Sequence, residues 1–156
     1  MTLHAACLLA SLLSSAAVKD FEGLTCGSDL APVLLGRRMS DGPVVKTEKR
    51  YEKLGLKALG SDEAEQGVTF VSWAICGDTY LTLERRSVIV DAVRIEGARD
   101  PAWSECKRSG ESATAPLLIV ADPAAAAFRV ARAFKIDYRA GKFVAVDPAG
   151  LTCEKP

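Results

Sequence analysis

Carboxylates, lysines and arginines carry most of the acid–base chemistry open to this sequence, because His4 is its only histidine. His4 lies in an N-terminal segment that we expect to be removed. A chain without histidine cannot form a Ser-His-Asp or Cys-His catalytic site, or a histidine-ligated zinc centre. The sequence also lacks a GxGxxG motif, a P-loop and a nucleophile elbow. We therefore predict no catalytic residue, no metal site and no cofactor, and lean against an enzyme.

A pair of carboxylates is the remaining route to hydrolysis, with one group as acid and the other as base or nucleophile. The candidates lie in the middle of the chain: Asp78, Glu84, Asp91 and Asp100. Since the chain has 20 acidic residues, such a choice is unspecific. Asp91 lies in an apolar run, where an unpaired carboxylate would be costly to bury. We expect an arginine partner or an edge position for it, in preference to a functional site.

The first residues have the pattern of a signal peptide. The segment from Ala5 to Val18 contains no charge, is rich in leucine and alanine, and closes on small residues. It is shorter than the roughly 20 residues of a membrane-spanning helix, so we predict cleavage after Ala17. An ordinary N-terminal helix is the alternative, because no lysine or arginine precedes the run. The prediction gives a signal peptide at 1–17 and a single β-rich domain at 18–156, periplasmic or secreted, without a membrane span.

Four cysteines remain after such cleavage: Cys26, Cys76, Cys106 and Cys153. An even number in an exported chain indicates two disulfides, for which three pairings are possible. The spacing is unlike the short CxxC steps of zinc sites. The neighbours of Cys76 include no cation or histidine that would activate a thiolate. We expect Cys76 to pair with Cys106, and Cys26 to pair with Cys153 outside that bridge.

Alternating apolar residues predict an antiparallel sheet built from hairpins. Consecutive strands are expected at residues 68–76, 79–84 and 88–95. The first strand places Val71, Trp73 and Ile75 on one face. Tight turns at Gly77-Asp78 and at Arg85 to Ser87 connect the three strands.

Further strands are predicted in the C-terminal half. The apolar run at 115–121 is typical of a buried strand, and alternation predicts another strand at 128–138. A helical turn is expected between them at 123–127. The strand at 142–146 pairs back through a hairpin in which Gly141 adopts a left-handed conformation.

The helical signals lie in the N-terminal third of the chain. Ser28 or Asp29 could cap a helix over 29–39, with Pro32 in its first turn. The Gly42-Pro43 pair is expected to end this helix.

The next segment is charged and ambiguous between helix and strand. Its alternation favours a strand at 51–59, followed by an acidic loop at 60–67. The predicted fold class is thus mainly β (α+β): an antiparallel sheet built from hairpins, with one or two short helices and two disulfides.

A long polar connection is predicted at 96–113, and we place a contact surface at 97–111 within it. Loops of this length inside compact domains are often functional, and a tryptophan on a loop can anchor a partner. The predicted binding residues are Arg99, Asp100, Trp103 and Lys107. The alternative is that Trp103 folds back over the sheet edge, beside a bridge between Cys76 and Cys106.

Two stretches carry a resemblance: "WAICGDTYLTL" at 73–83 and "FKIDYRAGKFVAVDPAGLTC" at 134–153. Together they resemble small exported bacterial proteins to which no function is assigned. The resemblance covers the C-terminal half of the chain and rests on a turn and on the placement of cysteines. It implies export and a β-rich fold, and it implies no activity.

The charge balance narrows the choice of partner. Lysine plus arginine and aspartate plus glutamate both number 20, whereas a nucleic-acid binder needs a positive excess. Three functions remain. The first is an exported binding domain for an unknown protein or small ligand, which could recognise or inhibit another protein. The second is a structural domain of the cell envelope, and the third is a histidine-free hydrolase, which would need two facing carboxyl groups in a cleft.

Overall fold

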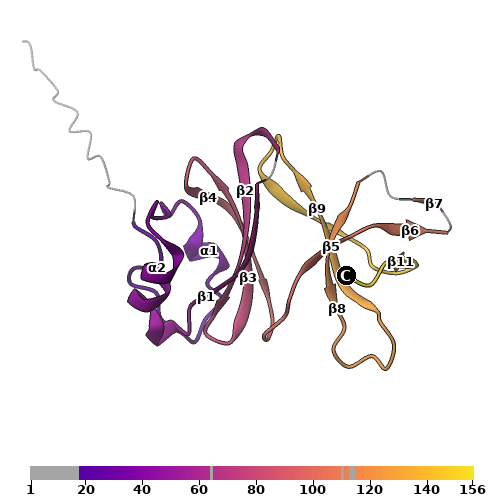
Figure 1. Ribbon diagram of the computed structural model, residues 1–156, viewed down its shortest axis with the longest axis horizontal. Coiled ribbons are helices and arrows are strands. Elements are labelled where there is room, and N and C mark those ends of the chain that lie inside the picture. The colour runs from indigo at the N-terminus through magenta and orange to yellow at the C-terminus, as the bar shows by residue number, and fades with distance from the viewer. Residues whose placement is uncertain (1–17, 64, 110, 113–114) are drawn as a thin grey trace, which may run out of the picture.

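Antiparallel strands dominate the computed structural model, which describes residues 18–63, 65–109, 111–112 and 115–156. Two short helices precede the strands (Figure 1), so the predicted fold class is confirmed. The predicted signal peptide lies outside the described residues. Within the part that is described, no helix is long and apolar enough to cross a membrane.

Sheet A is a four-stranded meander in the order β1-β2-β3-β4. Its strands are β1 (Lys57–Glu63), β2 (Val68–Ile75), β3 (Asp78–Arg85) and β4 (Val88–Ile95). The three consecutive strands predicted from alternation are confirmed as β2, β3 and β4.

Sheet B has the order β10-β9-β8-β5, and the smaller sheet C has the order β11-β6-β7. The strands of sheet B are β5 (Ala102–Ser104), β8 (Leu117–Ala121), β9 (Val130–Asp137) and β10 (Lys142–Val146). Those of sheet C are β6 (Cys106–Arg108), β7 (Glu111–Ser112) and β11 (Leu151–Cys153). Because β5 and β6 are separated by one residue, the chain passes from sheet B to sheet C at Glu105.

Residues 18–56, here called the N-terminal layer, cover the face of sheet A that points away from sheet B (Figure 1). The layer contains helices α1 (Ala31–Leu34) and α2 (Val44–Arg50) and the single-turn helix η1 (Glu52–Leu54). The Asp29 carboxylate accepts a hydrogen bond from the Ala31 N–H at 2.9 Å. The proline in the first turn is as predicted, but the helix begins at Ala31, two residues later than expected, and its N-cap is Leu30 instead of Ser28 or Asp29.

Several boundaries predicted in the N-terminal third are wrong. The first helix ends at Leu34, before a residue in extended conformation, and Gly42-Pro43 precedes α2 instead of ending a helix. The strand predicted at 51–59 begins at Lys57, after η1, and extends into the predicted acidic loop. The short segment η2 (Glu65–Gly67), which has non-helical backbone at Gln66 with a φ of 60°, follows β1.

The polar connection predicted at 96–113 is also wrong in part, because it contains the short strands β5, β6 and β7. Residues 123–127 form turns and bends without a helix, and β11 was not predicted. These strands are two or three residues long. Such short segments do not show the alternation that identifies a strand.

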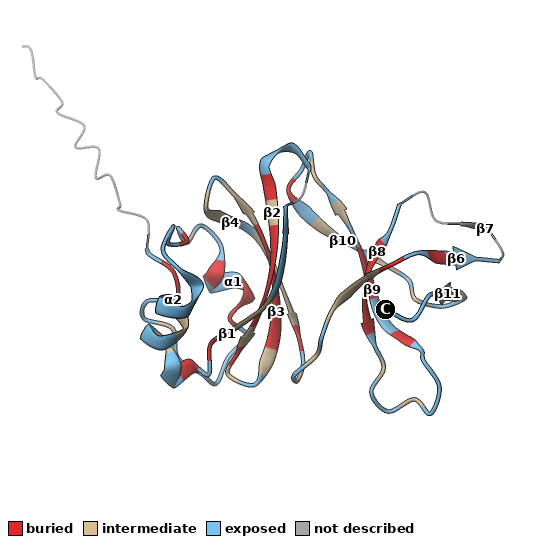
Figure 2. Cartoon of the chain, in the orientation of Figure 1, coloured by how far each residue is buried: buried red, intermediate tan, exposed pale blue. Residues whose placement is uncertain are grey.

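Three apolar cores separate four layers, as the distribution of buried residues in Figure 2 shows. The N-terminal layer packs on Val71, Trp73 and Ile75, which share one face of β2 as predicted. The opposite face of sheet A packs on sheet B, and the far face of sheet B packs on Cys106 and its neighbours in sheet C. Sheet A is therefore covered on both sides.

The two-residue turns that join β2 to β3 and β3 to β4 have left-handed residues at both central positions. They are Cys76-Gly77, with φ of 54° and 86°, and Arg86-Ser87, with φ of 52° and 59°. Positive φ at both positions is the type I′ geometry that matches the twist of the flanking strands. The predicted Gly77-Asp78 turn is thus wrong by one residue, and the predicted left-handed Gly141 is confirmed by its φ of 66°.

The left-handed backbone at Arg86 leads to a prediction about the stability of the protein. Asparagine adopts this conformation at less cost than arginine, so Arg86→Asn should raise the free energy of unfolding by about 0.5–1 kcal/mol. Chemical denaturation measures the change. Arg139→Asn is the control, because it removes the same charge from an exposed turn residue without a positive φ. An equal gain in both variants would assign the effect to charge.

The disulfides join Cys26 to Cys76 and Cys106 to Cys153. The presence of two bridges among these four cysteines is confirmed, but the predicted pairing of Cys76 with Cys106 is wrong. Cys76 lies at the end of β2, against the N-terminal layer, whereas Cys106 lies in sheet C beyond sheet B. Cys106 and Cys153 are direct neighbours across β6 and β11.

Candidate functional site

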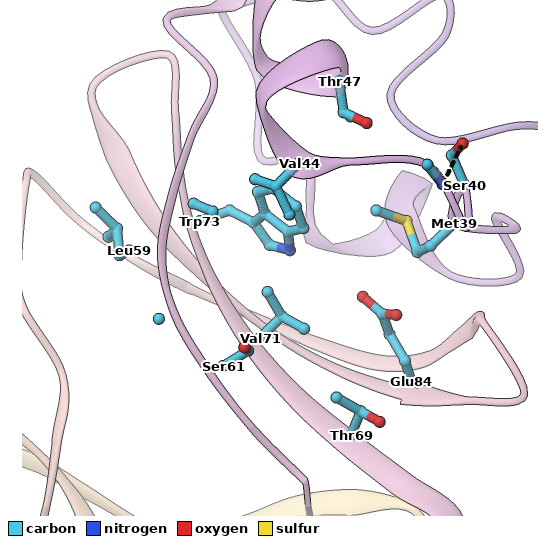
Figure 3. Close-up of a pocket in the computed structure, with 13 residues that line it drawn as sticks. Met39, Ser40, Val44, Thr47, Leu59, Ser61, Thr69, Val71, Trp73 and Glu84 are labelled. Atoms are coloured by element: carbon cyan, nitrogen blue, oxygen red, sulfur yellow. Dashed lines mark hydrogen bonds between the residues drawn. The ribbon is translucent and has the colours of Figure 1, made fainter.

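A pocket of about 340 Å³ opens between the N-terminal layer and sheet A (Figure 3). The N-terminal layer contributes Met39, Ser40, Gly42, Val44 and Thr47. Sheet A contributes Ala58, Leu59, Gly60, Ser61, Thr69, Val71, Trp73 and Glu84. The volume lies at the lower end of the range of about 300–1,000 Å³ for ligand pockets.

Strand register explains why β2 and β3 direct these side chains to the pocket. Thr69 pairs with Glu84, and Trp73 pairs with Tyr80, on the covered face of sheet A. Side chains alternate along a strand, so Thr69, Val71 and Trp73 follow one another on the same face. Glu84 continues the face of β3 that begins with Tyr80.

Two polar atoms on side chains that line the pocket are buried without a hydrogen-bond partner among the described residues: Trp73 Nε1 and Glu84 Oε1. The Trp73 side chain is held firmly, since the residue is 5% exposed and its ring meets the Phe21 ring edge-on at 5.0 Å. A buried polar group without a partner costs about 1–3 kcal/mol, and native proteins contain few of them. One donor and one acceptor thus share the wall of one pocket.

Burial raises the pKa of Glu84 to about 7, and the negative charge of Asp20 adds to the effect. The Asp20 carboxylate is itself satisfied, because it accepts the Ser40 N–H and lies 3.4 Å from the Arg50 guanidinium. Asp20 does not line the pocket. Glu84 is therefore an ionisable group that changes charge near neutral pH, beside a second carboxylate that is already paired.

The other carboxylates proposed from sequence have partners or lie elsewhere. Asp78 accepts hydrogen bonds from the Gly97 N–H at 2.7 Å and the Arg94 Nε at 2.8 Å, and these hold its pKa below the ordinary value. Asp91 lies on the edge strand β4 and accepts the Phe143 N–H of sheet B at 2.7 Å. This is the predicted edge position, with a backbone amide as the partner in place of an arginine.

The structure places the four predicted binding residues on different parts of the molecule. Arg99 and Asp100 line a separate hollow beside the start of β1. The Arg99 N–H is held by the Thr79 hydroxyl at 2.9 Å. Trp103 lies in β5 of sheet B, and the exposed Lys107 lies in β6 of sheet C. A binding role for these residues stays a prediction.

Trp103 connects the two large sheets. Its ring meets Phe70 of β2 edge-on at 5.9 Å, and its Nε1 donates to the Asp62 carboxylate of β1 at 2.6 Å. The alternative proposed from sequence placed Trp103 beside a bridge between Cys76 and Cys106, and that bridge does not exist. Trp103 is half-buried and packs against the core between the two large sheets.

Comparison of the chain with protein-family models, with curated proteins and with solved structures gave no match. The function is therefore argued from the geometry of the pocket.

Proposed function

We propose that the chain is an exported binding domain that takes a small polar ligand in the pocket between the N-terminal layer and sheet A. Export is supported by the two disulfides, because such bonds persist mainly in oxidising compartments. The predicted signal peptide is the second support.

One observation carries the binding proposal: the pocket wall contains an unpartnered donor, Trp73 Nε1, and an unpartnered acceptor, Glu84 Oε1. A ligand with complementary groups recovers the free energy lost in burying them. The remaining wall is largely apolar, with Met39, Val44 and Val71. Apolar walls with a few polar groups are typical of small-molecule sites.

A hydrolase with paired carboxylates has less support, because Glu84 is the single carboxylate that lines the pocket within the described part of the chain. General acid catalysis on a glycoside needs a second carboxylate facing the first. The nearby Asp20 is held by Ser40 and Arg50. A purely structural domain would have no need of two unpartnered polar atoms in one pocket.

A variant that fills the pocket tests the proposal. Thr69 is partly exposed and lines the pocket, so Thr69→Phe should fill it with little loss of stability. Ligand-observed NMR with a library of small polar compounds should detect binders of the wild-type protein that Thr69→Phe loses. Thr152→Phe is the matched control, because Thr152 is exposed in β11 of sheet C.

The proposal is supported if some compounds bind the wild type and Thr152→Phe equally well but bind Thr69→Phe at least about tenfold more weakly. Equal binding of every compound by all three proteins would place the ligand site elsewhere and exclude this proposal.

A further inference from the structure

The charge of the pocket restricts the ligand. Among the lining residues that the structure describes, Glu84 is the only charged side chain, and the buried carboxylate of Asp20 adds to the negative potential that Glu84 experiences. The Arg50 guanidinium pairs with Asp20 and is itself largely exposed. An anionic ligand would meet unpaired negative charge in a site of low dielectric constant, whereas a cation would be stabilised there.

The types of side chain on the pocket floor change in a regular order along β2. Thr69 lies opposite Glu84, Val71 comes next on the same face, and Trp73 follows. The four steps from Thr69 to Trp73 separate the Cα atoms of these two residues by about 13 Å in an extended strand. The floor thus runs from an acidic end through an apolar middle to a hydrogen-bond donor, and Figure 3 shows these side chains around one space.

We propose that the ligand is a linear organic monocation with a primary ammonium group at one end, a hydrocarbon middle, and a neutral carbonyl or hydroxyl oxygen at the other end. The ammonium donates to the Glu84 carboxylate, the hydrocarbon lies on Val71, and the oxygen accepts from Trp73 Nε1. This inference rests on the proposed binding function and names its ligand class.

Met39 is the pocket side chain that we expect to move when the ligand enters. It is buried and lines the pocket with Trp73 and Glu84 (Figure 3). Methionine is unbranched and changes rotamer at low cost. A turn of this side chain makes room for the ligand without a change in the sheet.

Calorimetric titration with 6-aminohexanamide tests the ligand class. Hexanamide is the neutral comparison with the same acceptor, and glycinamide carries both groups on one carbon. At about pH 8, where Glu84 is ionised, 6-aminohexanamide should bind about tenfold or more tightly than either compound. Glu84→Gln should remove the preference over hexanamide. Glu154→Gln should keep it, because this control removes a carboxylate from an exposed position near the C-terminus.

Three outcomes would overturn the ligand class: no binding of 6-aminohexanamide up to about 10 mM, equal binding of hexanamide, or equal binding of glycinamide. These outcomes do not decide whether the pocket binds a ligand at all, which the comparison with Thr69→Phe tests separately. If neutral or anionic compounds bind the wild type and are lost in Thr69→Phe, the pocket is a binding site and the proposed ligand class is wrong.

Discussion

Replacing Cys26 and Cys76 together by alanine should lower the free energy of unfolding by up to about 4 kcal/mol. The bridge joins residues 50 positions apart, so its loss gives a long segment more freedom in the unfolded chain. It also fixes the loop before α1 to the end of β2, where the N-terminal layer packs on sheet A. Denaturation in urea, with the wild type kept oxidised, measures the change.

The Cys106→Ala/Cys153→Ala variant is the matched control. Its bridge joins residues 47 positions apart, so the loss of stability should be similar, but the bridge lies in sheet C. Only the first variant should speed hydrogen exchange at the Trp73 indole N–H in the pocket. A first variant as stable as the wild type, or equal exchange in both variants, would contradict this role of the Cys26–Cys76 bridge.

Replacing Glu84 by glutamine should make the protein more stable at neutral and higher pH. The pKa of Glu84 is raised from 4.5 to about 7 in the folded protein, so folding favours the protonated carboxyl group. That contribution is complete below about pH 4.5 and is lost as the pH rises to about 7. Well above pH 7 the wild type therefore carries a cost of about 3 kcal/mol that Glu84→Gln avoids.

Denaturation of both proteins between about pH 4 and pH 8 measures this difference. The stability of Glu84→Gln relative to wild type should grow over this range. Glu154→Gln should show no such change, since Glu154 is exposed. A constant difference between Glu84→Gln and the wild type across the range would mean that Glu84 ionises like an ordinary glutamate.

The strands with clear alternation could be predicted from sequence, and the short ones could not. In β2 the alternation is carried by large residues such as Val71 and Trp73, and both faces of this strand are covered. The segment that forms α2 has charged residues on most sides, so it does not show the apolar stripe that identifies an amphipathic helix. β6 and β11 are held by the Cys106–Cys153 bridge and by neighbouring layers, which are contacts distant in sequence.

The disulfide pairing depends on which layers meet, and a sequence does not show this. Cys76 looks from spacing like a partner for Cys106, the next cysteine along the chain. The N-terminal layer folds over sheet A and brings Cys26 to it instead, with the Cα atoms 5.5 Å apart. The position of that layer is fixed by the apolar contacts of Phe21, Leu30 and Leu34 with sheet A.

The pocket could be anticipated only in part. Glu84 was one of four carboxylates considered, and it continues the face of β3 that carries Tyr80 and Thr82. The sequence does not reveal that other residues cover this face. The covering residues, Met39 among them, are distant from β3 in sequence. Without the cover, Glu84 is an ordinary glutamate at the end of a strand.

The pairing of the described cysteines has a consequence for synthesis. Cys26 joins Cys76, and Cys106 joins Cys153, so the first of these four cysteines bonds with the second, the third bonds with the fourth, and the two loops do not overlap. A chain that emerges from its N-terminus completes the first loop before Cys106 appears. Once the predicted signal peptide with Cys7 has been removed, an oxidant that joins thiols in order of emergence would form the native bonds directly, without the slow exchange needed to correct a wrong pair.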